Sequence, residues 1–143
     1  MSKISKEAYL SLLLKADEAR AQSYSPYSNK SVGAALLCAS GKIYTGANIE
    51  SASFSPTVCA ERVAFFSAVH AKERDFEAIA VSGGDVGQPA QDKFHPCGVC
   101  RQVMAEFCDD DFKIIVGTKD NAEEYTLAEI LPLRFGKAEM GTE

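Results

Sequence analysis

The chain has 143 residues and a formal net charge of −5, with 46% hydrophobic and 24% charged residues. This length suits one domain, and the composition is ordinary for a globular protein. Apolar runs stay well short of the ~20 residues that a membrane span requires, so we expect no membrane partner. The acidic balance also argues against nucleic acid as a partner, because polyanion binding depends on Lys and Arg contacts to phosphates.

The beginning of the chain, Met1 to Glu7, lacks the long apolar stretch of a secretory signal. The five cysteines are therefore expected to be reduced thiols in the cytoplasm rather than a disulfide framework.

The apolar pattern predicts eight elements in the order α-β-β-α-β-α-β-α. In chain order they are a helix over 4–20, strands over 32–39 and 43–49, a helix over 58–71, a strand over 76–82, a helix over 97–107, a strand over 112–117 and a helix over 126–131. The first two strands form a predicted hairpin, and Thr57 is the predicted N-cap of the second helix. The alternation of helices and strands after the hairpin indicates a mostly parallel sheet with helices on both faces. Residues 137–143 are expected to be a disordered tail.

Two cysteine motifs stand at predicted helix starts. Cys59-Ala60-Glu61-Arg62 opens one helix, and Pro96-Cys97-Gly98-Val99-Cys100 opens another. The free N–H groups and positive dipole end of a helix N-terminus favour thiolate. Three thiolates can hold zinc and leave its fourth position open, as catalytic sites do, whereas a closed structural site takes four protein ligands. The sequence therefore predicts a catalytic zinc site.

The residues beside the first cysteine complete this pattern. Zinc deaminases combine three such ligands with a glutamate that moves protons without binding the metal, and Glu61 is the candidate here. The metal supplies water whose pKa is lowered to near 7. Arg62 lies three residues after Cys59 and thus on the same helix face, so we expect its guanidinium to donate to the ligand sulfur and offset the negative charge of three thiolates.

Two other interpretations of the cysteines remain open from the residues alone. The C-G-x-C spacing of Cys97 and Cys100 is also found in redox pairs that open a helix, although a redox pair leaves the first motif unexplained. A closed structural zinc site would belong to a zinc-stabilised binding module without turnover. Its fourth ligand would be one of three remaining candidates, His95, Cys38 or Cys108.

Over residues 24–135 the chain resembles the short homotetrameric cytidine deaminases. Besides the two cysteine motifs, the resemblance is carried by Tyr27-Ser28 with Val32 to Leu36, by Asn48-Ile49-Glu50, by Arg101 to Phe107 and by Glu129 to Pro132. It implies an α/β fold, a three-layer α-β-α sandwich with a mixed five-stranded sheet, as one domain over 1–143. It also implies a homotetramer whose sites are completed by neighbouring subunits.

The resemblance further assigns roles to individual residues. Cys59, Cys97 and Cys100 would bind Zn²⁺, and Glu61 would shuttle protons. The predicted substrate contacts are Asn48 and Glu50 to the ribose hydroxyls, the backbone N–H of Ala60 to the pyrimidine O2, the backbone carbonyl of His95 or Pro96 to the 4-amino group, and Phe135 inserted into a neighbouring subunit's site.

The implied activity is hydrolytic deamination of cytidine and 2′-deoxycytidine to the uridines in pyrimidine salvage. Lys30 departs from the family, which usually has Phe at this position beside the pyrimidine ring. A lysine can lay its alkyl stem along a base, so Lys30 is retained as a substrate contact. The alternative that this departure raises is a deaminase of a cytosine nucleoside analogue, such as a nucleoside antibiotic.

Overall fold

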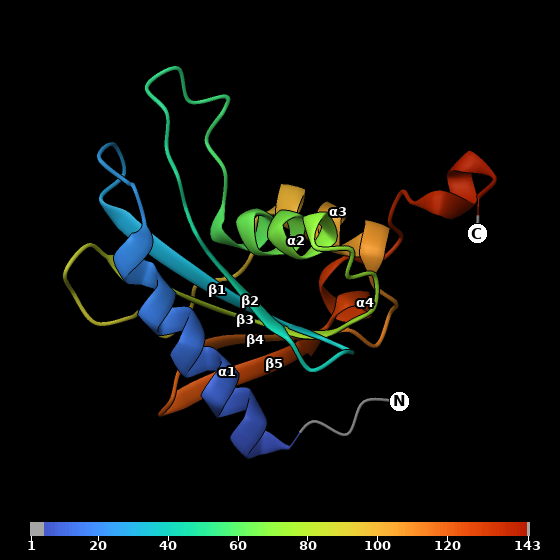
Figure 1. Ribbon diagram of the computed structural model, residues 1–143, viewed down its shortest axis with the longest axis horizontal. Helices are drawn as coiled ribbons and strands as arrows, with labels where there is room; N and C mark the ends of the chain where they lie inside the picture. The colour runs from blue at the N-terminus through green and yellow to red at the C-terminus, as the bar shows by residue number, and fades with distance from the viewer. Residues whose placement is uncertain (1–4, 143) are drawn as a thin grey trace.

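A computed structural model describes residues 5–142 and has a five-stranded sheet at its centre (Figure 1). The strand order is β2-β1-β3-β4-β5. Only β3 and β4 pair in parallel, whereas the other neighbours in this sheet are antiparallel. The strands are β1 (Lys30–Cys38), β2 (Ile43–Ala47), β3 (Phe76–Asp85), β4 (Lys113–Thr118) and β5 (Asn121–Thr126).

Helices cover both faces of the sheet, which confirms the expected three-layer sandwich (Figure 1). One face carries α1 (Lys6–Ala19), and the other carries α2 (Ala60–His70), α3 (Gly98–Phe107) and α4 (Leu127–Ile130). Two short 3-10 helices are η1 (Arg20–Gln22) and η2 (Lys137–Met140). In the part of the chain that the structure describes, we find no helix with the length and apolar character of a membrane span.

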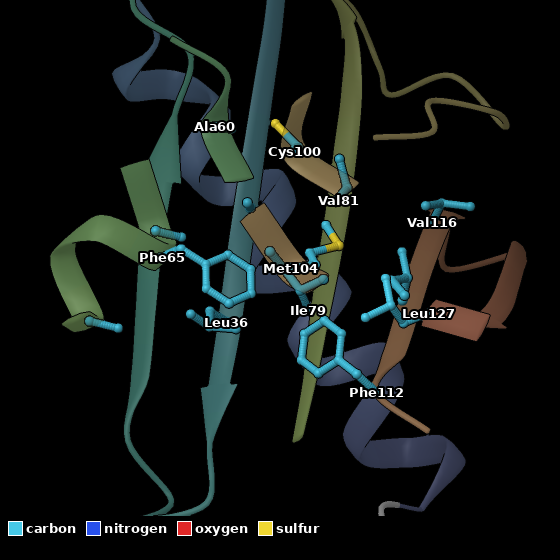
Figure 2. Close-up of a cluster of buried hydrophobic side chains, with 14 of the residues drawn as sticks. Leu36, Ala60, Phe65, Ile79, Val81, Cys100, Met104, Phe112, Val116 and Leu127 are labelled. Atoms are coloured by element: carbon cyan, nitrogen blue, oxygen red, sulfur yellow. The ribbon is translucent and has the colours of Figure 1, made fainter. Parts of the chain in front are cut away.

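Successive side chains of the central strands point to opposite faces of the sheet and pack into two separate cores, one on each face. The larger core lies beneath α2, α3 and α4, and Figure 2 shows ten of its members: Leu36, Ala60, Phe65, Ile79, Val81, Cys100, Met104, Phe112, Val116 and Leu127. The smaller core beneath α1 uses mainly small side chains from the sheet, among them Ala35, Ala78 and Ala80.

Those small side chains let α1 approach the sheet closely, and Gly33 marks the closest point. A Cβ atom added to Gly33 would lie 1.9 Å from the carbonyl oxygen of Ala16, which is on α1. The backbone of α1 therefore rests directly on β1.

A second close approach positions the helix that carries the first cysteine motif. A Cβ atom on Gly46 in β2 would lie 2.4 Å from the carbonyl oxygen of Ala60 and 2.6 Å from the backbone nitrogen of Ala64. At the middle of the same helix, the buried ring of Phe65 contacts Phe76 at a centroid separation of 5.2 Å. These contacts fix the start and the body of α2 against the sheet.

Two expectations differ from the structure, and one strand has no counterpart among the elements that the apolar pattern predicts. The mostly parallel sheet is wrong, because β3 pairs antiparallel with β1 and the chain ends the sheet with a second hairpin, β4 to β5. The apolar pattern does not locate β5, the fifth strand of the sheet that the resemblance implies. Thr57 does not cap α2, since its Oγ1 accepts from the Ser51 backbone N–H and Cys59 occupies the N-cap position. Within the expected tail over 137–143, residues 137–140 form η2 and residue 143 lies outside the described residues, so the disorder of the tail stays a prediction.

Candidate metal centre and active site

The three cysteines predicted to bind zinc come together where α2 and α3 begin. Cys59 and Cys97 are the N-cap residues of these helices, and Cys100 lies in the first turn of α3. Their sulfur atoms lie within 4.8 Å of one another, and the Sγ–Sγ distances from Cys97 to Cys59 and to Cys100 are both 3.6 Å. A tetrahedral zinc with bonds near 2.3 Å separates its sulfur ligands by about 3.8 Å, so the trio fits this metal.

No fourth protein ligand joins this trio among residues 5–142. Cys38 is buried at the end of β1 and Cys108 ends α3, each apart from the cluster. His95 instead packs edge-on against the ring of Tyr125, at a centroid separation of 5.7 Å. The arrangement therefore matches an open catalytic site better than the closed structural site.

The cluster favours a thiolate even without metal. A hydrogen bond from Cys100, followed by one from Arg62, lowers the pKa of Cys59 to about 5 although burial opposes it. Because Cys100 donates its thiol proton in the hydrogen bond to Cys59, the pKa of Cys100 is raised, and burial adds to the rise. The cluster thus has negative charge on Cys59, which prepares it for a cation.

Arg62 makes the contact that its spacing from Cys59 predicts. Its Nη2 lies 3.5 Å from the Cys59 sulfur. The Nε atom of Arg62 is buried and has no hydrogen-bond partner within the described chain. A positive charge held at this distance offsets the charge of the thiolates.

Glu61 is a buried carboxyl group in the first turn of α2, with 3% of its surface exposed. Burial raises its pKa to about 7, and the nearby Cys59 adds to the rise. A carboxyl group with a pKa near the working pH can both accept and return a proton. It is not one of the cluster's three possible metal ligands.

Asn48 and Glu50 lie just after β2, and the fold already uses both side chains. The Asn48 Oδ1 accepts from the Val32 backbone N–H at 2.9 Å and from the Ser23 hydroxyl at 2.6 Å, and its Nδ2 donates to the Lys30 carbonyl at 2.8 Å. A side-chain amide has two N–H donors, so one remains available to a ligand.

Glu50 is held in the same region by the turn before β1. Its Oε1 accepts from the backbone N–H groups of Tyr27 and Ser28 at 3.0 and 3.1 Å, and its Oε2 accepts from the Ser28 hydroxyl. These bonds, led by that hydroxyl, lower the pKa of the carboxyl group. Glu50 is thus a fixed, ionised acceptor.

The hydrogen bonds in the structure distinguish between the two backbone carbonyls, of His95 and Pro96, that are candidates for contacting a 4-amino group. The Pro96 carbonyl already accepts from the Arg101 Nε at 2.8 Å, and Arg101 also donates to the Ile130 carbonyl at 2.8 Å. The hydrogen bonds found between described residues leave the His95 carbonyl unused. His95 is therefore the better candidate, and sequence spacing did not reveal the role of Arg101.

Ala60 is the first residue of α2, so its backbone N–H has no acceptor within the helix. The Cys59 side chain does not cap that helix end. The amide is thus available, as its predicted contact with a pyrimidine requires.

Lys30 and Phe135 lie at the margins of this region. The Lys30 ammonium forms an ion pair with Asp85 at the end of β3. Phe135 is 60% exposed, in a segment after α4 that extends away from the sheet (Figure 1). The Gln102 Nε2 anchors this segment by donating to the Phe135 carbonyl at 2.8 Å.

A three-layer sandwich with three converging thiols and a buried glutamate at two helix starts defines the class of zinc-dependent deaminases. Residues 6–118 match the model of the family described as the cytidine and deoxycytidylate deaminase zinc-binding region. The chain belongs to this family, and its cofactor is zinc.

Individual relatives agree with this assignment. The chain is 45% identical over 130 residues to a cytidine deaminase of Sporosarcina psychrophila, which covers 90% of this chain and 92% of the relative. The crystal structure of cytidine deaminase from Burkholderia pseudomallei has a TM-score of 0.79 and 39% identity, covering 87% of this chain and 97% of that one. A blasticidin-S deaminase of Bacillus cereus is 31% identical over 111 residues, covering 73% of this chain and 76% of the relative.

Proposed function

We propose that this chain catalyses the hydrolytic deamination of cytidine and 2′-deoxycytidine to uridine and 2′-deoxyuridine, with release of ammonia. The observation that carries the proposal is the buried Glu61 beside a three-thiol cluster that fits zinc. The relatives described above as cytidine deaminases support the choice of substrate.

The residues have separate tasks in this reaction. Cys59, Cys97 and Cys100 hold the zinc, which when bound supplies a Lewis acid and activated water. Glu61 would accept a proton from the attacking water and return it to N3 of the pyrimidine, and would then carry the proton of the new C4 hydroxyl to the 4-amino group, which leaves as ammonia. Its raised pKa suits both directions of transfer.

Other groups orient the substrate. The Ala60 N–H would donate to O2 of the base, and the His95 carbonyl would accept from the 4-amino group. Asn48 and Glu50 would bind the ribose hydroxyls through the free Nδ2 donor and the ionised carboxylate. The hydrogen bonds already made by Asn48 and Glu50 hold them in place, so little conformational entropy is lost on binding.

The test is a substrate panel followed by the loss of ultraviolet absorbance, with zinc measured on the same sample. We expect turnover of cytidine and 2′-deoxycytidine by protein carrying about one zinc per chain. A zinc-loaded protein that turns over neither nucleoside would contradict the proposal.

A second candidate substrate is a cytosine nucleoside analogue. Lys30 and the blasticidin-S deaminase relative support it, since that relative differs from cytidine deaminases in the substrate its name gives. Including blasticidin S in the panel separates the two, because the preferred substrate will have the higher kcat/KM.

We also propose that the enzyme is a cytoplasmic homotetramer in pyrimidine salvage, with sites completed by neighbouring subunits. All five cysteines are free thiols, which suits a reducing compartment. The loop between β2 and α2 and the segment after α4 project from the body (Figure 1). They carry exposed apolar side chains, Ile49, Phe54, Leu133 and Phe135, that a neighbouring subunit would cover.

A further inference from the structure

The ion pair between Lys30 and Asp85 lies next to the residues that would bind the sugar. The Lys30 backbone N–H donates to the Ser28 hydroxyl at 3.0 Å, and Ser28 in turn donates to Glu50. The Lys30 carbonyl accepts from the Asn48 Nδ2. A sugar held by Asn48 and Glu50 therefore lies beside Lys30.

The fold places Asp85 directly opposite Lys30. The two residues are paired in the register of β1 and β3, at the ends of these strands. The side chains of both are about half exposed, at 45% for Lys30 and 52% for Asp85, so a ligand can reach the pair.

A buried arginine fixes both sides of this pair. The Arg20 Nε donates at 3.0 Å to the carbonyl of Ser31, the residue after Lys30. Its Nη2 donates at 3.1 Å to the Asp85 carbonyl. Arg20 is only 8% exposed and pairs with Asp17 at 3.1 Å, so its own charge is neutralised and shielded from a ligand.

The charges beside the sugar position thus sum to a negative value. Lys30 is neutralised by Asp85, Arg20 is neutralised by Asp17, and Glu50 remains as an ionised carboxylate. A phosphate monoester carries a charge of roughly −1.5 to −2 at neutral pH. To bind here, it would have to separate Lys30 from Asp85 while facing Asp85 and Glu50.

We propose that Asp85 is a specificity-determining residue that occupies the Lys30 ammonium and thereby excludes nucleosides phosphorylated at the 5′ position. This inference rests on the proposed function. The 5′ position is the relevant one, because Asn48 and Glu50 require the ribose hydroxyls that they bind to be free.

The experiment compares uridine and uridine 5′-monophosphate as competitive inhibitors of cytidine turnover. In Asp85→Asn, the freed ammonium should lower the inhibition constant of the monophosphate about two- to fivefold relative to that of uridine. The gain should shrink with added salt, because the contact is exposed. The charge-matched control is Asp120→Asn in the exposed turn after β4, where neither inhibition constant should change.

Two further variants test whether the lowered inhibition constant depends on the ion pair between Lys30 and Asp85. Adding Lys30→Met to Asp85→Asn should abolish the gain, whereas Lys30→Met alone leaves the Asp85 carboxylate unpaired and should not strengthen inhibition by the monophosphate. The inference is overturned if Asp85→Asn has no effect on the ratio of the two inhibition constants, or if the gain persists in the double variant that lacks Lys30. A parent protein that does not deaminate cytidine would instead refute the proposed function, which is a separate outcome.

Discussion

Asn48 and Glu50 illustrate how one side chain can serve both folding and binding. Asn48 has most of its hydrogen-bonding capacity committed to the backbone around β1, so its substitution would disturb the fold as well as the ligand. Glu50 is bonded to a single exposed turn and gives the cleaner test.

Glu50→Ala should reduce kcat/KM for cytidine about 10- to 100-fold, because a charged hydrogen bond to the sugar is worth roughly 1–3 kcal/mol. The reduction should be far smaller for free cytosine, which lacks the sugar. The measurement is the ratio of the two values. Equal losses on the nucleoside and the base would show that Glu50 does not contact the sugar.

Removing the metal should expose a reactive thiolate at Cys59. Its pKa of about 5 means that it is already ionised at pH 6, so alkylation of metal-free protein should change less than about twofold between pH 6 and pH 8. Burial raises the pKa of Cys38 to about 11, and its side chain is 1% exposed, so Cys38 should resist labelling until unfolding.

Mass spectrometry of labelled peptides measures each cysteine separately, and zinc-loaded protein is the control in which Cys59 is protected. A rate at Cys59 that rises about tenfold per pH unit over this range would contradict the lowered pKa.

At the scale of single residues, the sequence predicts the metal-binding and catalytic side chains well, but it predicts poorly the hydrogen bonds and ion pairs that support them. The cysteine motifs and Glu61 are recognisable because their spacing on a helix start is local. Arg101 and Asp85 act through carbonyls and ion pairs that only the tertiary structure brings together. Arg101 belongs to a block that carries the resemblance, but its spacing does not name its carbonyl partners, and nothing in the sequence around Asp85 distinguishes it from a surface residue.

Among the elements, the starts of α2 and α3 decide where the active groups lie, and the close approach of α1 supports the opposite face of the sheet. Gly33 permits that approach of α1. Gly33→Ala should lower the free energy of unfolding by about 1–3 kcal/mol, because the added methyl group overlaps the Ala16 carbonyl and α1 must shift.

Urea denaturation at fixed protein concentration measures this change. The matched control is Gly136→Ala, where a Cβ atom would have its nearest neighbour at 4.0 Å and the midpoint should not move. Equal midpoints for Gly33→Ala and the parent protein would contradict the tight packing of α1.

The elements that the sequence predicts have strong apolar periodicity, and the missed β5 does not. Its sequence, Asn121 to Thr126, contains adjacent glutamates and lies at the edge of the sheet. Strands of this kind are specified by pairing with a neighbour rather than by their own composition. Its absence from the prediction explains one of the unexpected antiparallel pairs, and the other is the pairing of β1 with β3.

For the whole molecule, the central question is whether one subunit makes a complete site. Phe135 lies in the projecting segment, and we predict that it acts in a neighbouring subunit. Glu61→Gln and Phe135→Ala should each reduce activity as pure proteins. Mixed oligomers should regain part of it, because the first variant supplies Phe135 and the second supplies Glu61.

Activity after the two variants are refolded together measures this complementation, and each variant refolded alone is the control. A mixture no more active than its components would place Phe135 in its own subunit's site or outside any site.

The central claim is that Glu61 performs proton transfer beside a zinc held by three cysteines, and Glu61→Gln tests it most directly. An amide of the same shape cannot relay protons, so kcat for cytidine should fall by at least about 10²-fold. The variant should still carry about one zinc per chain, since Glu61 is not a ligand. Turnover near the parent rate in the zinc-loaded variant would contradict the account.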